Sequence, residues 1–75
     1  MRTAYKFEIG SRSGTIDCFD VAADGFAEAW SEAQRKLGKV SITTAKVRNP
    51  QAFGDSYWHP INEARKLEKI ARVQA

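Results

Sequence analysis

The spacing of apolar residues changes along this chain, and this change limits the folds that it can adopt. In residues 4–9, AYKFEI, apolar and polar side chains alternate, which is the period of a half-buried β-strand. Residues 10–14, GSRSG, predict a turn in which both glycines take positive φ angles. Residues 15–21, TIDCFDV, are rich in β-branched and aromatic side chains and predict a second strand, which completes a β-hairpin. We expect Phe19 and Val21 on its buried face.

The spacing then becomes helical. One apolar stripe is formed by Phe26, Ala29, Trp30, Ala33 and Leu37. We therefore expect a helix over residues 24–37. Asp24 is predicted to be its N-cap, because a carboxylate can accept hydrogen bonds from the first-turn amides. Gly38 is predicted to end it, because glycine readily adopts the left-handed conformation that follows many helices.

A third strand is predicted for residues 39–48, KVSITTAKVR. Its apolar residues change parity near Thr43 and Thr44, and this change indicates a β-bulge. Asn49 and Pro50 end the strand, because proline has no N–H group to donate to a neighbouring strand.

Residues 49–59 are expected to form a long irregular loop, followed by a helix over residues 60–73 with Pro60 in its first turn. The order is β-β-α-β-α. The strand–helix–strand connection makes strands two and three parallel, so strand three can pair antiparallel with strand one. We expect a two-layer α+β fold with a three-stranded antiparallel sheet, order 2-1-3, and both helices on one face. The strand that carries Lys46 and Arg48 would be one sheet edge.

The size of the chain predicts a single small α+β domain over residues 1–75, with a marginal core. The single cysteine, Cys18, excludes an internal disulfide and a cysteine-cluster zinc site. No apolar run approaches the roughly 18 residues of a membrane span. The first ten residues, MRTAYKFEIG, lack an apolar secretory region. We therefore expect a cytoplasmic protein without a membrane partner.

Catalytic and metal chemistry find little support in the sequence. Asp55 and Ser56 lie near His59, the only histidine, but groups this close in sequence rarely reach the geometry of a catalytic triad. Asp55, His59 and Glu63 are spaced by four residues, but Pro60 disfavours a continuous helix through them. The sequence therefore predicts no catalytic residue, no metal site and no cofactor.

Charge is distributed unevenly along the chain, whose formal net charge is +3. Residues 1–34 carry six acidic and three basic side chains, whereas residues 35–75 carry nine basic and three acidic ones. If the two parts are also separated in space, the resulting field can orient a charged partner. The alternative is that the two parts neutralise each other by pairing.

Beside the basic part, residues 53–60, FGDSYWHP, contain three aromatic rings. We expect Phe53 to cap the core and Tyr57 to be exposed, while core and surface positions both stay open for Trp58. Trp, Tyr and Arg dominate protein interfaces, and aromatic rings also stack on the bases of single-stranded nucleic acids. The residues that we expect to contact a partner are Tyr57, Trp58, Arg65, Lys69, Arg72, Lys46 and Arg48.

Residues 14–38, GTIDCFDVAADGFAEAWSEAQRKLG, resemble a pattern of many short bacteriophage and mobile-element proteins. In that pattern a hairpin leads through an Ala-Asp step into a helix rich in Glu-Ala pairs. The resemblance implies an accessory protein that acts in the host cytoplasm, often by occluding a host complex; anti-CRISPR inhibitors are one kind. Many such inhibitors are acidic DNA mimics. Because this chain is basic, the resemblance favours one that covers an acidic protein surface.

Two functions are therefore predicted. The first is a small non-enzymatic inhibitor or adaptor that binds a host protein complex through a basic and aromatic surface. The alternative is a nucleic-acid-binding protein that uses the basic C-terminal helix together with Tyr57 and Trp58. An exposed sheet edge also allows a homodimer.

Overall fold

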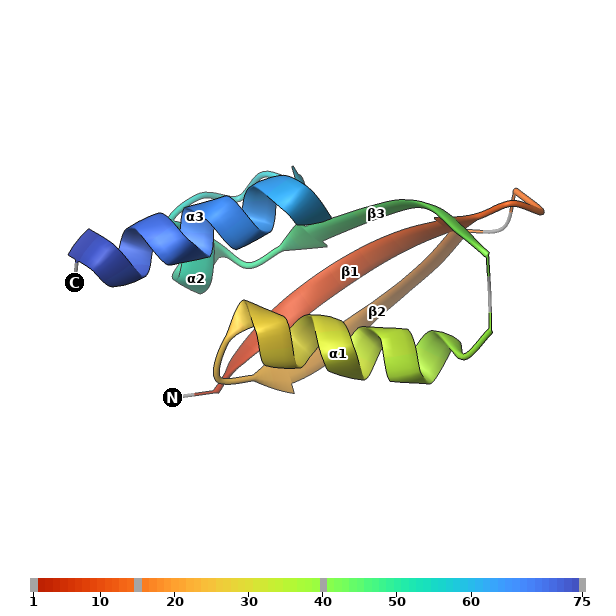
Figure 1. Ribbon diagram of the computed structural model, residues 1–75, viewed down its shortest axis with the longest axis horizontal. Helices are drawn as coiled ribbons and strands as arrows, with labels where there is room; N and C mark the ends of the chain where they lie inside the picture. The colour runs from red at the N-terminus through yellow and green to blue at the C-terminus, as the bar shows by residue number, and fades with distance from the viewer. Residues whose placement is uncertain (1, 15, 40, 75) are drawn as a thin grey trace.

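The computed structural model describes residues 2–14, 16–39 and 41–74, and it describes side chains as far as Glu68. The fold is α+β, with four strands in one open antiparallel sheet (Figure 1). The elements are β1 (Thr3–Ser11), β2 (Ile16–Ala23), α1 (Phe26–Leu37), β3 (Ile42–Arg48), α2 (Pro50–Phe53), β4 (His59–Pro60) and α3 (Ile61–Gln74). Among the described residues, no helix is long and apolar enough to cross a membrane.

The strand order is β2-β1-β3-β4, and neighbouring strands are antiparallel. The predicted order 2-1-3 is therefore present, but the prediction of three strands is wrong because β4 joins the sheet. β4 pairs Pro60 with Lys46 and His59 with Val47. The C-terminal part of β3 is consequently not the sheet edge that we expected.

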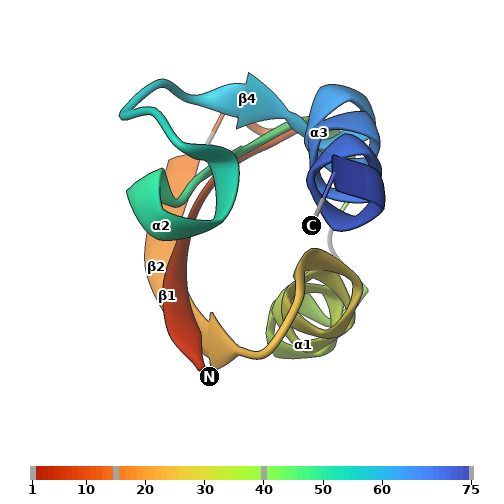
Figure 2. The same ribbon diagram turned by 90° about the vertical axis from the view of Figure 1, so that its left-hand side faces the viewer.

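The core lies between the inner face of the curved sheet and the two long helices, α1 and α3 (Figure 2). Its buried side chains are Tyr5, Phe7, Ile9, Val21, Ala23 and Val47 from the sheet, with Phe26, Ala29, Ala33 and Ala64 from the helices. α1 packs against β1 and β2, whereas α3 packs against β3 and β4. Full burial of a Phe side chain stabilises a fold by about 2–3 kcal/mol, so Phe7 and Phe26 contribute strongly to so small a core.

A β-bulge interrupts the pairing of β1 with β3, as the parity change predicted. The register shifts by one residue between Gly10 and Ser11, so that Thr43 is the extra residue of β3. Beyond the bulge Ser11 pairs with Ile42. The bulge therefore brings Ile42 onto the inner face of the sheet, the face that Ala45 also occupies.

The two glycines of the first hairpin have different roles. Gly14 takes a φ of 87° in the turn, as expected. Gly10 does not take a positive φ; it lies within β1, where an added Cβ would be 2.4 Å from Thr44 Oγ1. Glycine at this position therefore permits the close approach of β3.

The start of α1 differs from the prediction. Gly25, not Asp24, is its N-cap residue. The backbone N–H of Phe26 instead donates a 2.6 Å hydrogen bond to Glu68 Oε2, a carboxylate from α3. The helix ends as predicted at Gly38, whose φ is 66°. A carboxylate from a distant helix thus takes the place that we assigned to the local aspartate.

Residues 49–59 are not the irregular loop that we expected, because they contain α2 and lead into β4. Asn49 is buried and caps α2: its Oδ1 accepts hydrogen bonds of 3.1 Å from the N–H groups of Gln51 and Ala52. Its Nδ2 donates to Thr3 Oγ1 at 2.8 Å, which ties α2 to the start of β1. The last helix begins at Ile61, since Pro60 belongs to β4 rather than to the first helical turn.

Candidate binding surface

The outer face of the sheet carries two rows of polar side chains across the strands. Lys6 of β1 lies opposite Asp20 of β2 and Arg48 of β3. Two residues further along β1, on the same face, Glu8 lies opposite Cys18 and Lys46. Directly opposed residues on one face have Cβ atoms about 4.5–5.5 Å apart, so each row forms a continuous polar strip. Both long helices lie on the other side of the sheet, which leaves this face open (Figure 2).

Trp58 is held over this outer face. The pairing of β4 places His59 opposite Val47, on the inner side, and the alternation of strand side chains turns the preceding Trp58 outward. Trp58 lines a shallow hollow with the outer-face residues Lys6, Cys18 and Asp20. Its exposed fraction is 36%, so a substantial part of the indole is available for contact.

The loop before Trp58 is fixed by Asp55. Its Oδ1 lies 2.7 Å from His59 Nε2 and accepts a hydrogen bond of 3.1 Å from the Tyr57 N–H. The hydrogen bond with His59 is the main reason that the pKa of Asp55 is lowered from its ordinary value of 3.8. The His59 ring in turn packs edge-on against Phe53, with ring centroids 5.4 Å apart. Asp55 therefore fixes the conformation of the loop from which Tyr57 and Trp58 project.

The aromatic residues between positions 53 and 58 differ in how deeply they are buried. Phe53 is half-buried and contacts the rings of Tyr5 and Phe26, so it caps the core as predicted. Tyr57 is 74% exposed. Together with Trp58 it supplies exposed aromatic area next to the polar rows.

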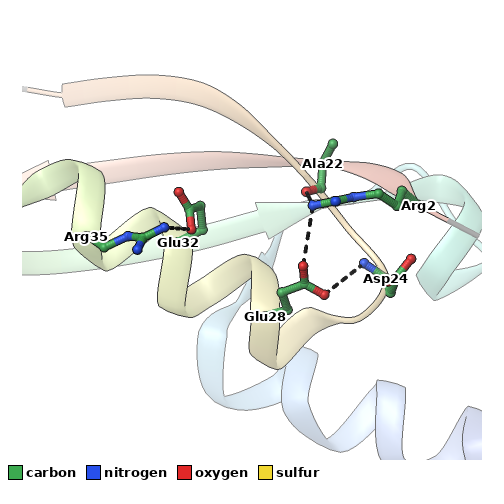
Figure 3. A network of polar contacts seen from close by, with 6 residues as sticks. All are labelled: Arg2, Ala22, Asp24, Glu28, Glu32 and Arg35. Atoms are coloured by element: carbon green, nitrogen blue, oxygen red, sulfur yellow. Dashed lines mark hydrogen bonds and ion pairs between the residues drawn. The ribbon is translucent and has the colours of Figure 1, made fainter.

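The basic side chains of the outer face differ from Arg2 and Arg35 in their pairing with carboxylates. Within the described residues, no ion pair joins Lys6, Lys46 or Arg48 to a carboxylate. In contrast, Arg2 pairs with Glu28 at 3.4 Å, and Glu32 pairs with Arg35 (Figure 3). Two carboxylates of the acidic part are thus locally compensated, whereas the three outer-face cations form no such ion pair within the described residues.

The structure divides the predicted contact residues between two faces. Trp58, Lys46 and Arg48 belong to the outer face with its adjoining loop, which also contains Tyr57. Arg65 lies elsewhere, in a hollow between α1 and α3. The side chains of Lys69 and Arg72 are outside the described residues.

Sequence reasoning missed Lys6, Cys18 and Asp20 as neighbours of Trp58. The hairpin pattern contained a usable signal, since alternation places Lys6 and Cys18 on the unburied face of their strands. The register that sets Lys6 opposite Asp20 depends on the turn length, and Trp58 reaches them only because β4 joins the sheet. No three His, Cys, Asp or Glu side chains of the described part are grouped so that they could hold a metal ion.

Comparison of the chain with protein-family models, curated proteins and solved structures finds no match.

Proposed function

We propose that this chain is a small binding protein without catalytic activity, and that its outer sheet face contacts an acidic surface of a partner protein. The contact surface comprises Lys6, Lys46, Arg48, Tyr57 and Trp58. In keeping with the pattern in residues 14–38, the partner would be a host complex that a phage or mobile-element protein inhibits or adapts.

The exposed position of Trp58 carries this proposal. A chain this small has few large apolar side chains, and most of them are needed for its core. Trp58 nevertheless lies against the open face with 36% of its surface exposed, beside unpaired cations. Interface hot spots are enriched in Trp, Tyr and Arg, and all three residue types occur here within a few residues of the hollow.

The mixture of charges favours a protein partner over a nucleic acid. Asp20 and Glu8 lie in the same rows as the three cations, and carboxylates repel a phosphate backbone. Protein interfaces, in contrast, use interleaved charges to fix the register of the two partners.

A nucleic-acid partner is the second candidate, because a base could stack on the Trp58 indole. Lys6 lines the same hollow as this indole, and Arg48 lies opposite Lys6. Such stacking is worth about 1–3 kcal/mol per base in single-strand binders. Binding of that kind would weaken steeply as the salt concentration rises.

The test is affinity capture from an extract of the native host, with and without nuclease. The variants Trp58→Ala and Arg48→Glu should lose the captured protein, because they remove the stacking area and reverse one contact charge. Arg12→Glu is the matched control: it makes the same charge change about 20 Å away along β1.

A partner protein that survives nuclease and is lost only from the two surface variants supports the proposal. Retention of that protein by Trp58→Ala and Arg48→Glu would refute it. Capture of nucleic acid alone, with the same two variants defective, would establish the second candidate instead.

A further inference from the structure

A second surface lies on the opposite side of the sheet, between α1 and α3, which stand apart from each other (Figure 2). Two adjoining hollows meet there. One is lined along α1 by Phe26, Ala27, Trp30, Ser31 and Gln34. The other is lined by Ile42–Lys46 of β3 and by the start of α3. Trp30 and Arg65 line both hollows, so the two form one groove, which we call the inner groove.

The inner groove has an incomplete apolar lining. Figure 1 shows that α3 runs away from β3, so this helix does not cover the N-terminal half of that strand. Ile42 faces inward because of the bulge at Thr43, yet 37% of its surface is exposed. Trp30 packs against Phe7 with ring centroids 5.9 Å apart but is only half-buried. Among the described residues, no side chain fully covers Ile42 and Trp30 at this end of the inner layer.

The charges at the groove are mainly basic. Arg65 is exposed where the two hollows meet, and Lys46 lines the second hollow. Among the described lining residues, Glu68 is the only carboxylate. It is already engaged, because it accepts hydrogen bonds from the Phe26 N–H and the Tyr5 hydroxyl. An occupant with apolar and acidic side chains would complement this lining.

We propose that the inner groove binds one acidic amphipathic helix of a partner protein. The α1 wall runs from Phe26 to Gln34, about 12 Å at 1.5 Å per residue, which matches roughly two turns of a second helix. Apolar side chains at i, i+3 or i+4 and i+7 would lie on Trp30 and Ile42, as in other helix-in-groove complexes. A carboxylate on the rim side of the helix would meet Arg65.

Two other occupants fit the groove less well. A second copy of this chain would have to offer an exposed acidic amphipathic helix, but α1 packs most of its apolar stripe against the core and the described part of α3 carries Arg65 and Lys66. A strand added to the free part of β3 would meet the bulge at Thr43, and bulges hinder regular pairing at sheet edges.

The probe is a labelled helical peptide of about 16 residues, with Leu at the apolar positions and Glu and Ala elsewhere. Two peptides serve as controls: one with Lys in place of Glu, and one with the same composition in scrambled order. The protein contains two tryptophans, so Trp58→Phe leaves Trp30 as the only indole, and Trp30→Phe leaves Trp58. The acidic peptide should shift the Trp30 emission of the first variant and leave the Trp58 emission of the second unchanged.

Paired substitutions locate the site further. Arg65→Glu should raise the Kd of the acidic peptide about tenfold, whereas Lys66→Glu, one residue along α3 and outside the groove lining, should leave it unchanged. Ile42→Gln should weaken binding, whereas Ile16→Gln should not, because Ile16 is 64% exposed on β2 away from the groove. Circular dichroism confirms that each variant is folded.

Several results would overturn the proposal. One is the absence of any Trp30 response up to about 1 mM peptide. Another is equal affinity for the acidic, basic and scrambled peptides. A Trp30 emission that depends on protein concentration, with dimers in sedimentation, would assign the groove to a second copy. A response to laurate but not to the peptide would assign it to a small amphipathic ligand.

Discussion

The carboxylate of Asp55 connects the core to the exposed aromatic residues. It binds the His59 ring, which packs on Phe53, and it accepts the N–H of Tyr57. A hydrogen bond that favours the charged form lowers the pKa of a carboxyl group. The hydrogen bond between Asp55 and His59 therefore fixes the loop and makes the stability of the fold depend on pH.

We predict that Asp55→Asn reduces stability near neutral pH and that this difference shrinks in acid. The pKa of Asp55 in the folded protein is lowered from 3.8, so its carboxylate stabilises the fold above that value. The contribution is lost as the pH falls through the lowered pKa. Urea midpoints of both proteins, measured from about pH 6 down to about pH 2, should converge at the acid end. A gap that stays constant over this range would contradict the prediction.

Single residues were predictable where their role is local. Phe53 was expected to cap the core because so small a core needs large apolar side chains, and Gly38 was expected to end α1; both predictions are confirmed. Asp24 was a reasonable N-cap by residue type. The prediction failed because Glu68, 42 residues beyond Phe26, supplies the carboxylate. A contact between residues so far apart in the sequence cannot be predicted from a local residue pattern.

At the scale of elements, the contact between Glu68 and the start of α1 joins the two long helices. The first amides of a helix lack intrahelical acceptors, and the helix dipole favours a negative charge there. The Phe26 N–H bond to Glu68 satisfies one such amide, and the Tyr5 hydroxyl binds the same oxygen at 3.4 Å. One side chain of α3 thus holds α1 and β1 in place.

We predict that Glu68→Ala lowers the free energy of unfolding by about 1–3 kcal/mol, because it leaves a part-buried amide and hydroxyl without this acceptor. Glu63→Ala is the control: it removes an exposed carboxylate from the same helix. Chemical denaturation followed by circular dichroism measures both. Equal effects of the two substitutions would show that helix content, rather than the contact with α1, controls stability.

The long elements were predictable and the short ones were not. Alternation in β1, the helical stripe of α1 and the parity change in β3 all correspond to observed structure. α2 and β4 have four and two residues, too few for any apolar period. α2 depends on the Asn49 cap, and β4 forms only where the chain meets β3.

At the scale of the whole molecule, the sheet separates two candidate surfaces. The sequence placed Trp58 and Arg65 in one contact surface because they are close along the chain. β4 and the start of α3 lie between them, and they direct Trp58 outward and Arg65 toward the inner groove. The direction of a final helix relative to a sheet is set by tertiary packing, which the residue pattern did not contain.

We predict that the two surfaces act independently. Lys46 borders both surfaces, so the test uses Arg48, which does not line the inner groove. Arg48→Glu should abolish capture of the outer-face partner and leave the peptide affinity of the inner groove within about twofold, because distant substitutions are nearly additive. Arg65→Glu should weaken binding of the acidic peptide and leave capture of the outer-face partner unchanged. Peptide titration and affinity capture on both variants measure the two effects. Loss of both activities in either variant would indicate a single contact surface.

β1 is an interior strand of the sheet, and its side chains alternate between the core and the outer face. Phe7 is enclosed by the core, whereas Lys6 and Glu8 beside it point toward solvent and toward any partner. Substitutions of Lys6 and Glu8 should therefore alter the outer face of the sheet and leave the core side chains of β1 in place. The outward positions of this strand are thus expected to accept substitutions that its inward positions do not.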